Sequence, residues 1–444
     1  MPRRPPSKPA ASPTEDNERT GLIPLALLAL VAGAAAGLIG ACFRYLLERG
    51  DEIRNALITW AHGYQLFGLA ILVALAAATT ALAAWLVHRF SPEASGSGIP
   101  HVEAVLHGNA PPTKLRLIAV KFVGGLLAIG SGLALGREGP TVQMGASIAH
   151  YIGTTFRRNA ADARILLAAG AGAGLATAFN APIAGSIFVL EELVRRFDTR
   201  ITIATLGTSA AAIAISRVIL GDQPDFAIDA FPYSEFSTVP AYLVLGLFIG
   251  VLGIAYNRAI VGTLAAANRM KSIPVEVRAA TIGAAIALIA WFAPAWVGGG
   301  DPITEQALAG QTALAILPAF FAARFALGAI SYAAGTPGGL FAPMLVLGAQ
   351  AGLFFGYFAT RWFPVAGTDP AAYAVTGMAA FFTAVVRCPV TGIILVIELT
   401  ASDTQLLSML AACFTAMLVP TLGGNLPIYD SLGKPPASDS TATN

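Results

Sequence analysis

The chain carries many apolar segments, and more than half of them are cut short by glycine or proline. Five segments could each span or nearly span a bilayer: 66–88, 202–220, 239–262, 277–298 and 312–334. Seven are shorter or interrupted: 117–135, 141–153, 165–178, 181–193, 341–360, 372–386 and 389–400. Short broken helices are tolerated in a membrane only where their free ends are buried in protein or line a cavity. The pattern therefore predicts an all-α polytopic membrane protein with many short broken helices, of the transporter or channel type.

The composition agrees with a membrane location and excludes several other classes. Hydrophobic residues make up 56% and charged residues 12% of the 444 residues, with a mean hydropathy of +0.69; a soluble domain has roughly twice that share of charge. The net charge of +2 is small and scattered, so no nucleic-acid partner is expected. Cys42, Cys388 and Cys413 lie in apolar runs and are interpreted as small buried hydrophobes, without the spacing of a metal site or a disulfide framework.

The two ends differ from the apolar body. Residues 1–20 are polar and proline-rich and are predicted to be a disordered cytoplasmic N-terminus, while 434–444 form a disordered tail. The cations of the first segment favour its cytoplasmic location: Arg3, Arg4, Lys8 and Arg19. The run 21–43 that follows is long enough to span, and too long for the core of a signal peptide. No soluble regulatory domain is expected at either end.

The body contains an internal repeat. At a shift of 203 residues, the first block and its copy are Gly136-x-x-x-Pro140, Gly145, Gly153 and Gly339-x-x-x-Pro343, Gly348, Gly356. At a shift of 207, the second block and its copy are Gly170, Pro182, Gly185, Glu191 and Gly377, Pro389, Gly392, Glu398. The alternative is a chance match in a glycine-rich chain. Repeated halves with interrupted helices predict a first membrane repeat at 21–220, a second at 221–433 and a binding site between them near the midplane. The sequence leaves open whether the halves are inverted.

Three segments are the strongest candidates for chemistry: Gly-Ser-Gly-Ile-Pro at 96–100, Gly-Arg-Glu-Gly-Pro at 136–140 and Gly-Leu-Phe-Ala-Pro at 339–343. Glycine followed by proline is typical of a chain that opens a helix with its backbone exposed. Helix N-termini carry partial positive charge, so several that converge would bind an anion without a full cation. The alternative is that each segment is a tight helix crossing that needs small residues. Glu138 favours function, because an ionisable residue at membrane depth is costly.

Together these segments resemble the CLC family of chloride channels and chloride/proton antiporters, in its bacterial-type transporter branch. Pro427-Ile428-Tyr429 is similar to the family segment that holds an anion-coordinating tyrosine, and the resemblance covers roughly residues 21–433. It implies an all-α CLC-type inverted repeat that forms a homodimer in the lipid bilayer, with one anion path in each subunit. It also implies a multi-pass protein of the bacterial inner (plasma) membrane.

The resemblance also implies residue roles. Ser97 and Tyr429 would bind chloride through their hydroxyls, and the backbone N–H groups of Leu340 and Phe341 would complete that central site. The backbone at Gly139 would contribute nearer the outside. Glu138 would be the external gate and a proton acceptor, whose ionised carboxylate occupies the anion site and whose protonated form swings away. The alternative for Glu138 is a structural salt bridge with Arg137, which otherwise would set the potential at the outer mouth.

A second acid decides between two functions. The resemblance implies that Glu192 is the internal proton acceptor, a residue that channels of the family usually lack. The alternative is a solvated helix end, but negative charge at a helix C-terminus opposes the dipole, so structure alone gives little reason for it. Glu191 matches Glu398 in the repeat and is predicted to be structural. Glu103 is predicted to be a structural partner of Lys121 or another cation.

The predicted function is a chloride/proton antiporter, with chloride and protons as transported ions, no cofactor and no enzymatic activity. The alternative within the family is a passive chloride channel, against which Glu192 argues. A fluoride exporter of the family is disfavoured by Ser97 together with Tyr429. A nitrate-selective transporter is disfavoured by Ser97, a position where such relatives tend to carry proline. An intramembrane hydrolase using Ser97 with His101 is also disfavoured, because Pro100 interrupts the helix that would place them on one face.

Overall fold

The computed structural model describes residues 13–226, 228, 231–270, 272–362 and 369–433. Its first half contains α1 (Pro13–His62), α2 (Gln65–Phe90), α3 (Ile99–Leu106), α4 (Arg116–Gly130), α5 (Glu138–Thr155), α6 (Ala160–Phe179), α7 (Pro182–Phe188), a π-helical turn (Val189–Leu193) and α8 (Thr199–Leu220). The second contains α9 (Val239–Arg269), α10 (Val275–Phe292), α11 (Asp301–Leu308), α12 (Leu317–Tyr332), α13 (Phe341–Trp362), α14 (Pro370–Val386), α15 (Pro389–Thr400) and α16 (Leu406–Leu422), and α17 (Ile428–Gly433) follows. The only β-pairing among the described residues is two isolated bridges. The predicted all-α class is confirmed.

Six helical stretches in the described part of the chain are long and apolar enough to cross a membrane: Gly21–His62, Gln65–Phe90, Thr199–Leu220, Phe236–Arg269, Val275–Phe292 and Phe341–Arg361. Two of the predicted lengths are wrong. The segment 341–360 was expected to be short or interrupted but is one continuous helix, while 312–334 yields only the 16 residues of α12. In addition, α1 begins at Pro13, within the segment 1–20 for which disorder was expected; residues 1–12 and 434–444 lie outside the described residues.

The two halves repeat the same series of elements. The eight-residue helices α3 and α11 each follow a glycine in the left-handed conformation, Gly98 with φ 82° and Gly300 with φ 99°. Helices α6 and α14 each end at a residue with positive φ, Asn180 and Arg387, just before the proline that opens α7 or α15. The order and lengths of the elements therefore confirm that the sequence repeat is structural.

Two glutamates establish how the halves are related. The carboxylate of Glu191 accepts hydrogen bonds from two first-turn N–H groups of α15 at 3.0 and 2.7 Å. Glu398, its counterpart 207 residues later, accepts from two first-turn N–H groups of α7 at the same two distances. Each acid near the end of one helix therefore caps the start of the other, so the two helices run antiparallel about a local two-fold axis. A two-fold axis across membrane-crossing helices lies in the membrane plane, so the repeat is inverted.

This reciprocal capping predicts a measurable loss of stability. Glu398→Gln removes the negative charge from the N-terminus of α7 and should lower the free energy of unfolding by about 1–2 kcal/mol, since charge-assisted hydrogen bonds are the stronger ones. Glu191→Gln should cost somewhat more, because the Thr391 hydroxyl also donates to Glu191 at 2.7 Å. The unfolding temperature of the detergent-solubilised protein measures both effects. An unfolding temperature equal to that of the parent in both variants would contradict the structural role of this pair.

Some glycines of the repeat serve close packing. A Cβ on Gly145 would lie 2.3 Å from the carbonyl oxygen of Gly170, and a Cβ on Gly348 would lie 2.5 Å from that of Gly377. No side chain fits at either crossing, so α5 packs directly on the backbone of α6, and α13 on that of α14. This contact explains the continuity of α13: its glycines meet a neighbouring helix, and the packing offsets the cost of about 1 kcal/mol for glycine within a helix.

Candidate functional site

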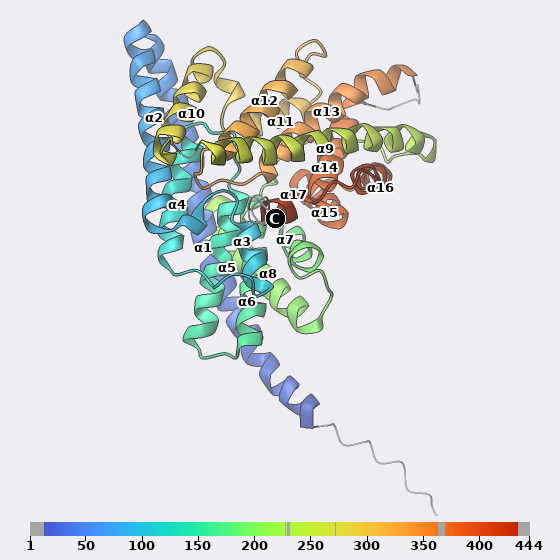
Figure 1. The fold of residues 1–444 in the computed structure, drawn as a ribbon. Coiled ribbons are helices and arrows are strands. Elements are labelled where there is room, and N and C mark those ends of the chain that lie inside the picture. Colours follow the sequence, from blue (N-terminus) through green and yellow to red (C-terminus); the bar gives the residue numbers. More distant parts are fainter. Residues whose placement is uncertain (1–12, 227, 229–230, 271, 363–368, 434–444) are drawn as a thin grey trace, which may run out of the picture.

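The three candidate segments meet at the local two-fold axis. Gly136 and Gly339 exchange two backbone hydrogen bonds, at 2.9 Å from N to O and 2.7 Å in return. The first segment joins them through Gly96, whose N–H donates to Thr336 O at 3.0 Å and whose carbonyl accepts from Gly338 N at 3.1 Å. The starts of α3, α5 and α13 are thereby fixed at one place, and α17 lies near the centre of the molecule beside α3 (Figure 1). The positive ends of several helices converge there, as the sequence predicted.

Two hydroxyls at this place are available to a ligand. Ser97 and Tyr429 are both fully buried, and neither Ser97 Oγ nor Tyr429 Oη has a hydrogen-bond partner within the described residues. The ring of Phe341 stacks on Tyr429 with centroids 6.2 Å apart. A Cβ on Gly139 would lie 2.5 Å from Ser97 Oγ, so only glycine lets the backbone of α5 approach the hydroxyl. Buried hydroxyls are nearly always hydrogen-bonded, so two unpaired hydroxyls from segments distant in sequence indicate a ligand site.

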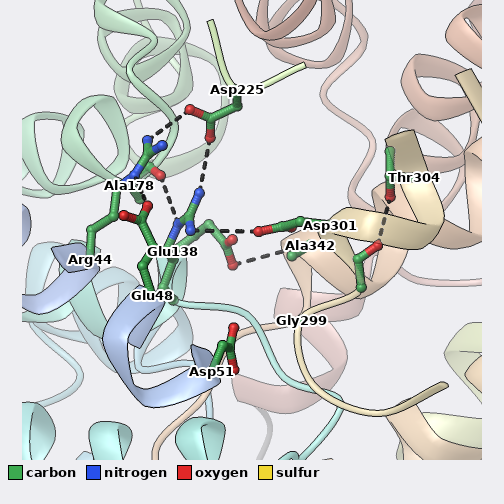
Figure 2. Close-up of polar contacts among 12 residues, drawn as sticks. Arg44, Glu48, Asp51, Glu138, Ala178, Asp225, Gly299, Asp301, Thr304 and Ala342 are labelled. Carbon is green, nitrogen blue, oxygen red and sulfur yellow. Dashed lines mark hydrogen bonds and ion pairs between the residues drawn. The ribbon is translucent and has the colours of Figure 1, made fainter. Parts of the chain in front are cut away.

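The start of α13 supplies further donors. The helix begins at Phe341, directly after the buried Leu340, and the N–H groups of a first helical turn have no acceptor within their own helix. The Glu138 carboxylate, 1% exposed, lies at this turn, with Oε2 at 3.5 Å from Ala342 N. Figure 2 shows this contact beside a network of ion pairs. The carboxylate therefore occupies the same kind of donors that a small anion would use.

Arg137 does not form a salt bridge with Glu138. Its guanidinium donates to Asp225 at 2.9 Å and to Ala178 O at 3.0 Å, and it lies 3.7 Å from Asp301 (Figure 2). Arg137 is therefore held from three sides, and its partner Asp225 is itself fixed by an ion pair with Arg44 at 2.8 Å. The alternative that explained Glu138 as a partner of Arg137 is therefore wrong, and the carboxylate at the start of α5 is left free for another role.

On the opposite side of the site, Glu192 lies in the π-helical turn and is only 3% exposed. Its Oε2 accepts from Cys388 Sγ at 3.0 Å and lies 3.7 Å from Arg195, while Oε1 has no partner among the described residues. The alternative of a solvated helix end is therefore wrong. π-Helical turns are rare and frequently occur at functional sites. A buried carboxylate with an unpaired oxygen in such a turn therefore indicates a functional residue.

Glu103 has a cationic partner, as the sequence predicted, and that partner is Arg195 at 3.2 Å and not Lys121. The buried ammonium of Lys121 instead donates to the carbonyls of Ala94 and Gly96 at 3.0 and 2.7 Å, which holds the first segment in place. Cys388 is buried as predicted, but its thiol contacts an acid rather than serving only as a hydrophobe.

The alternative of an intramembrane hydrolase that uses Ser97 with His101 fails on geometry. Ser97 Oγ makes no hydrogen bond to His101, so the described residues contain no Ser–His pair here. No group of three or more His, Cys, Asp or Glu side chains in the described ranges is arranged to hold a metal ion.

Sequence reasoning missed Arg195, Asp225 and Asp301. Only Asp301 had a detectable signal in the sequence, because it follows the triplet Gly298-Gly299-Gly300. In the repeat this triplet is the counterpart of the first candidate segment, since each of the two precedes an eight-residue helix.

Comparisons with known proteins agree with this geometry. Residues 79–421 match the family described as voltage gated chloride channel. The H(+)/Cl(-) exchange transporter ClcA of Vibrio cholerae is 38% identical over 413 residues, 91% of this chain and 88% of that protein. A slow cyanobacterial Cl⁻/H⁺ antiporter has a similar structure, with a TM-score of 0.88, 32% identity and coverage of 92% of this chain and 97% of that one. A eukaryotic CLC transporter shares the fold, with a TM-score of 0.80 at 23% identity over 93% of this chain and 74% of that one. The chain belongs to the voltage-gated chloride channel, or CLC, family.

Proposed function

We propose that this protein is a chloride/proton antiporter of a bacterial inner membrane, multi-pass and without an enzymatic reaction. One observation carries the proposal: two buried carboxylates, Glu138 and Glu192, flank a set of unpaired anion donors, where a passive anion path would need neither. The similarity to proteins named as H⁺/Cl⁻ exchangers, at 38% and 32% identity, supports exchange over passive flow.

Chloride is held by donors that carry no full charge. The hydroxyl of Ser97, in the segment before α3, and that of Tyr429, on α17, point to the anion, and the backbone N–H groups at Leu340 and Phe341 add the start of α13. The backbone at Gly139 contributes on the outer side. Neutral donors replace the water that chloride loses but hold it weakly enough to release it, which a transported ion requires.

Glu138 couples the proton to the anion by competition. When ionised, its carboxylate remains at the first turn of α13 and excludes chloride from those donors. When it takes up a proton, the attraction to the helix N-terminus is lost and chloride can replace it. Because proton and chloride each change the binding of the other, the two movements are linked.

Glu192 exchanges the proton with the cytoplasm. Its carboxylate is buried but lies 3.7 Å from Arg195, which also contacts Glu103 at 3.2 Å and Asp430 at 2.8 Å. Asp430 is about one-third exposed and Arg195 nearly half, so this cluster extends from the buried acid to the surface. Protons that enter from outside through Glu138 leave through this cluster while chloride moves in the opposite direction.

Proton movement in liposomes tests the function. The purified protein is reconstituted, a chloride gradient is imposed, and the external pH is followed while a potassium ionophore fixes the membrane potential. An antiporter moves protons against their own gradient at the expense of chloride. Chloride flux without proton movement would instead make the protein a passive channel and would refute the proposal.

The central hydroxyls can be tested separately. Ser97→Ala and Tyr429→Phe each remove one donor and should weaken chloride binding about 10-fold or more, since a hydrogen bond to an ion contributes about 1.5–3 kcal/mol. The number of protons moved per chloride should fall as well. Calorimetric titration with chloride and the flux assay measure both. Ser209→Ala is the control, because this buried serine also lacks a partner in the described residues but lies on α8. Unchanged binding in both variants would remove these hydroxyls from the site.

We further propose that the protein is a homodimer whose subunits each contain the two repeats, 21–220 and 221–433. The antiparallel pair α7 and α15 presents apolar side chains at equivalent positions, Ile183 at 52% and Val390 at 50% exposure. The neighbouring α16 adds Phe414 at 65%. Light scattering in detergent gives the mass of the protein particle, and a monomer under all detergent conditions would contradict the proposal.

A further inference from the structure

Two cavities meet at Asp301 on the outer side of the protein. A wide pocket of about 360 Å³ is lined by Asp51, Arg54 and Asp301 together with the chain around Gly299. A narrow cavity of about 10 Å³ is lined by Glu138, Arg137 and again Asp301. A volume of that size holds about one water molecule. Asp301 thus lies between the open pocket and the small cavity that reaches the buried gate.

The Asp301 side chain is well placed to exchange protons with the solution. It is 48% exposed, whereas Glu138 is 1% exposed. It begins α11, and its ion pair with Arg137 is long, at 3.7 Å, while Arg137 already has two shorter partners. Arg137 therefore has two shorter contacts besides Asp301, and Figure 2 shows the ion pair that joins Asp301 to this network.

The charges around Asp301 come from several elements. Its own helix carries Glu305, and the surrounding charged groups are Asp51 and Arg54 of α1, Arg137 directly before α5, Glu138 at the start of α5, Asp225 and the buried Arg324 of α12. With Asp301 itself these are five acids and three arginines, so the charge of the region does not exclude protons. The position of Asp301 between the two cavities is what distinguishes it.

We propose that Asp301 is the outer proton relay of this protein. A hydronium ion or a buffer acid in the wide pocket gives its proton to the Asp301 carboxylate. The protonated acid then passes that proton, through one water in the narrow cavity, to the Glu138 carboxylate, and Asp301 returns to its ionised form. No electron transfer or other reactant is involved. This inference rests on the proposed exchange function, because a relay matters only if Glu138 takes up protons.

The competing explanation is electrostatic, since a carboxylate at the outer mouth could act on chloride or on Arg137. The two explanations differ when the gate no longer titrates. In the Glu138→Gln background chloride moves without protons, so a relay has no effect there, whereas an electrostatic effect on the anion persists.

The experiment measures the initial rate of coupled proton uptake at several external pH values. Asp301→Asn should slow exchange about 10-fold at alkaline external pH, where hydronium is scarce, and little at acidic pH, where direct transfer suffices; removal of a proton-transfer group costs up to 10²–10⁴-fold where no bypass exists. The ratio of protons to chloride should be unchanged. Asp301→Glu, or external imidazole added to Asp301→Asn, should restore the rate. Glu305→Gln, which removes a charge from the same helix but lines another pocket, should resemble the parent.

Three results would overturn the inference. The first is a rate for Asp301→Asn that equals the parent at every pH. The second is an equal loss at every pH without rescue, which indicates a structural effect. The third is a change in chloride flux when Asp301→Asn is combined with Glu138→Gln, which places the effect on the anion. Absence of proton movement in the parent would overturn the proposed function as well, so the two failures are distinguishable.

Discussion

Replacement of Glu138 by alanine is expected to abolish proton movement while chloride continues to pass. The side chain is buried at the first turn of α13, with Ala342 N at 3.5 Å, and it has no ion pair with the adjacent Arg137. In the proposed mechanism its loss therefore removes both the competitor for the anion donors and the group that takes up the proton. Coupled proton flux should fall by at least about 100-fold, the lower range for loss of a positioned proton-transfer group.

Paired measurements of proton and chloride flux in liposomes test this expectation. Glu48→Gln is a suitable control, because Glu48 is a half-exposed outer acid that pairs with Arg44 and lines neither outer cavity. Chloride flux in the Glu138 variant should also lose its dependence on external pH. Proton transport that survives in Glu138→Ala would disprove the gate assignment, whatever happens to chloride.

Replacement of Glu192 by glutamine should lower the proton flux about as much as Glu138→Ala does, and should change the chloride flux less. The amide keeps the shape of the side chain and the contact with Cys388 Sγ, but it cannot carry a proton. Since Glu192 makes no hydrogen bond to Ser97 or Tyr429, we expect the anion path to remain and the gate to be protonated from outside as before. Proton flux should therefore disappear while chloride flux is retained.

The neighbouring acid provides the matched control. Glu191→Gln changes the same functional group one residue earlier, where the carboxylate caps α15, so it should lower the unfolding temperature and leave the ratio of protons to chloride intact. A Glu192→Gln variant that still moves protons uphill would show that the cytoplasmic proton takes another route. Loss of chloride flux together with proton flux in Glu192→Gln would make the residue structural.

Local sequence signals predicted much of the architecture. Glycine and proline placed the starts of α3, α5 and α13, and the shifts of 203 and 207 residues identified halves that the structure then showed to be inverted. The length of α13 was not predictable, because a glycine breaks a helix or packs it against a neighbour depending on partners distant in sequence. Partners distant in sequence also determine that Lys121 donates to backbone carbonyls, and that Arg195 is the cation with which Glu103 pairs.

Residues at the centre of the candidate site could be predicted from the sequence better than the charged residues around it. Ser97, Glu138 and Tyr429 stand in motifs with a fixed local pattern, so their positions could be anticipated. Asp225, Asp301 and Arg195 lie in connecting segments or at their edges, and their significance arises only from the cavities and ion pairs that form once the chain has folded. Cys388 gave no signal, because its contact with Glu192 joins residues from opposite halves of the repeat.

The position of Tyr429 on α17 has a consequence for biosynthesis. Ser97 and Tyr429 are more than 300 residues apart in the chain, and α17 is the last helix that the structure describes. At about 5–20 residues per second, a ribosome needs roughly 17–65 seconds to pass from one to the other. During that interval the growing chain carries Ser97 without the tyrosine hydroxyl of the proposed anion site. If the proposed site is correct, selective exchange begins only once α17 is in place.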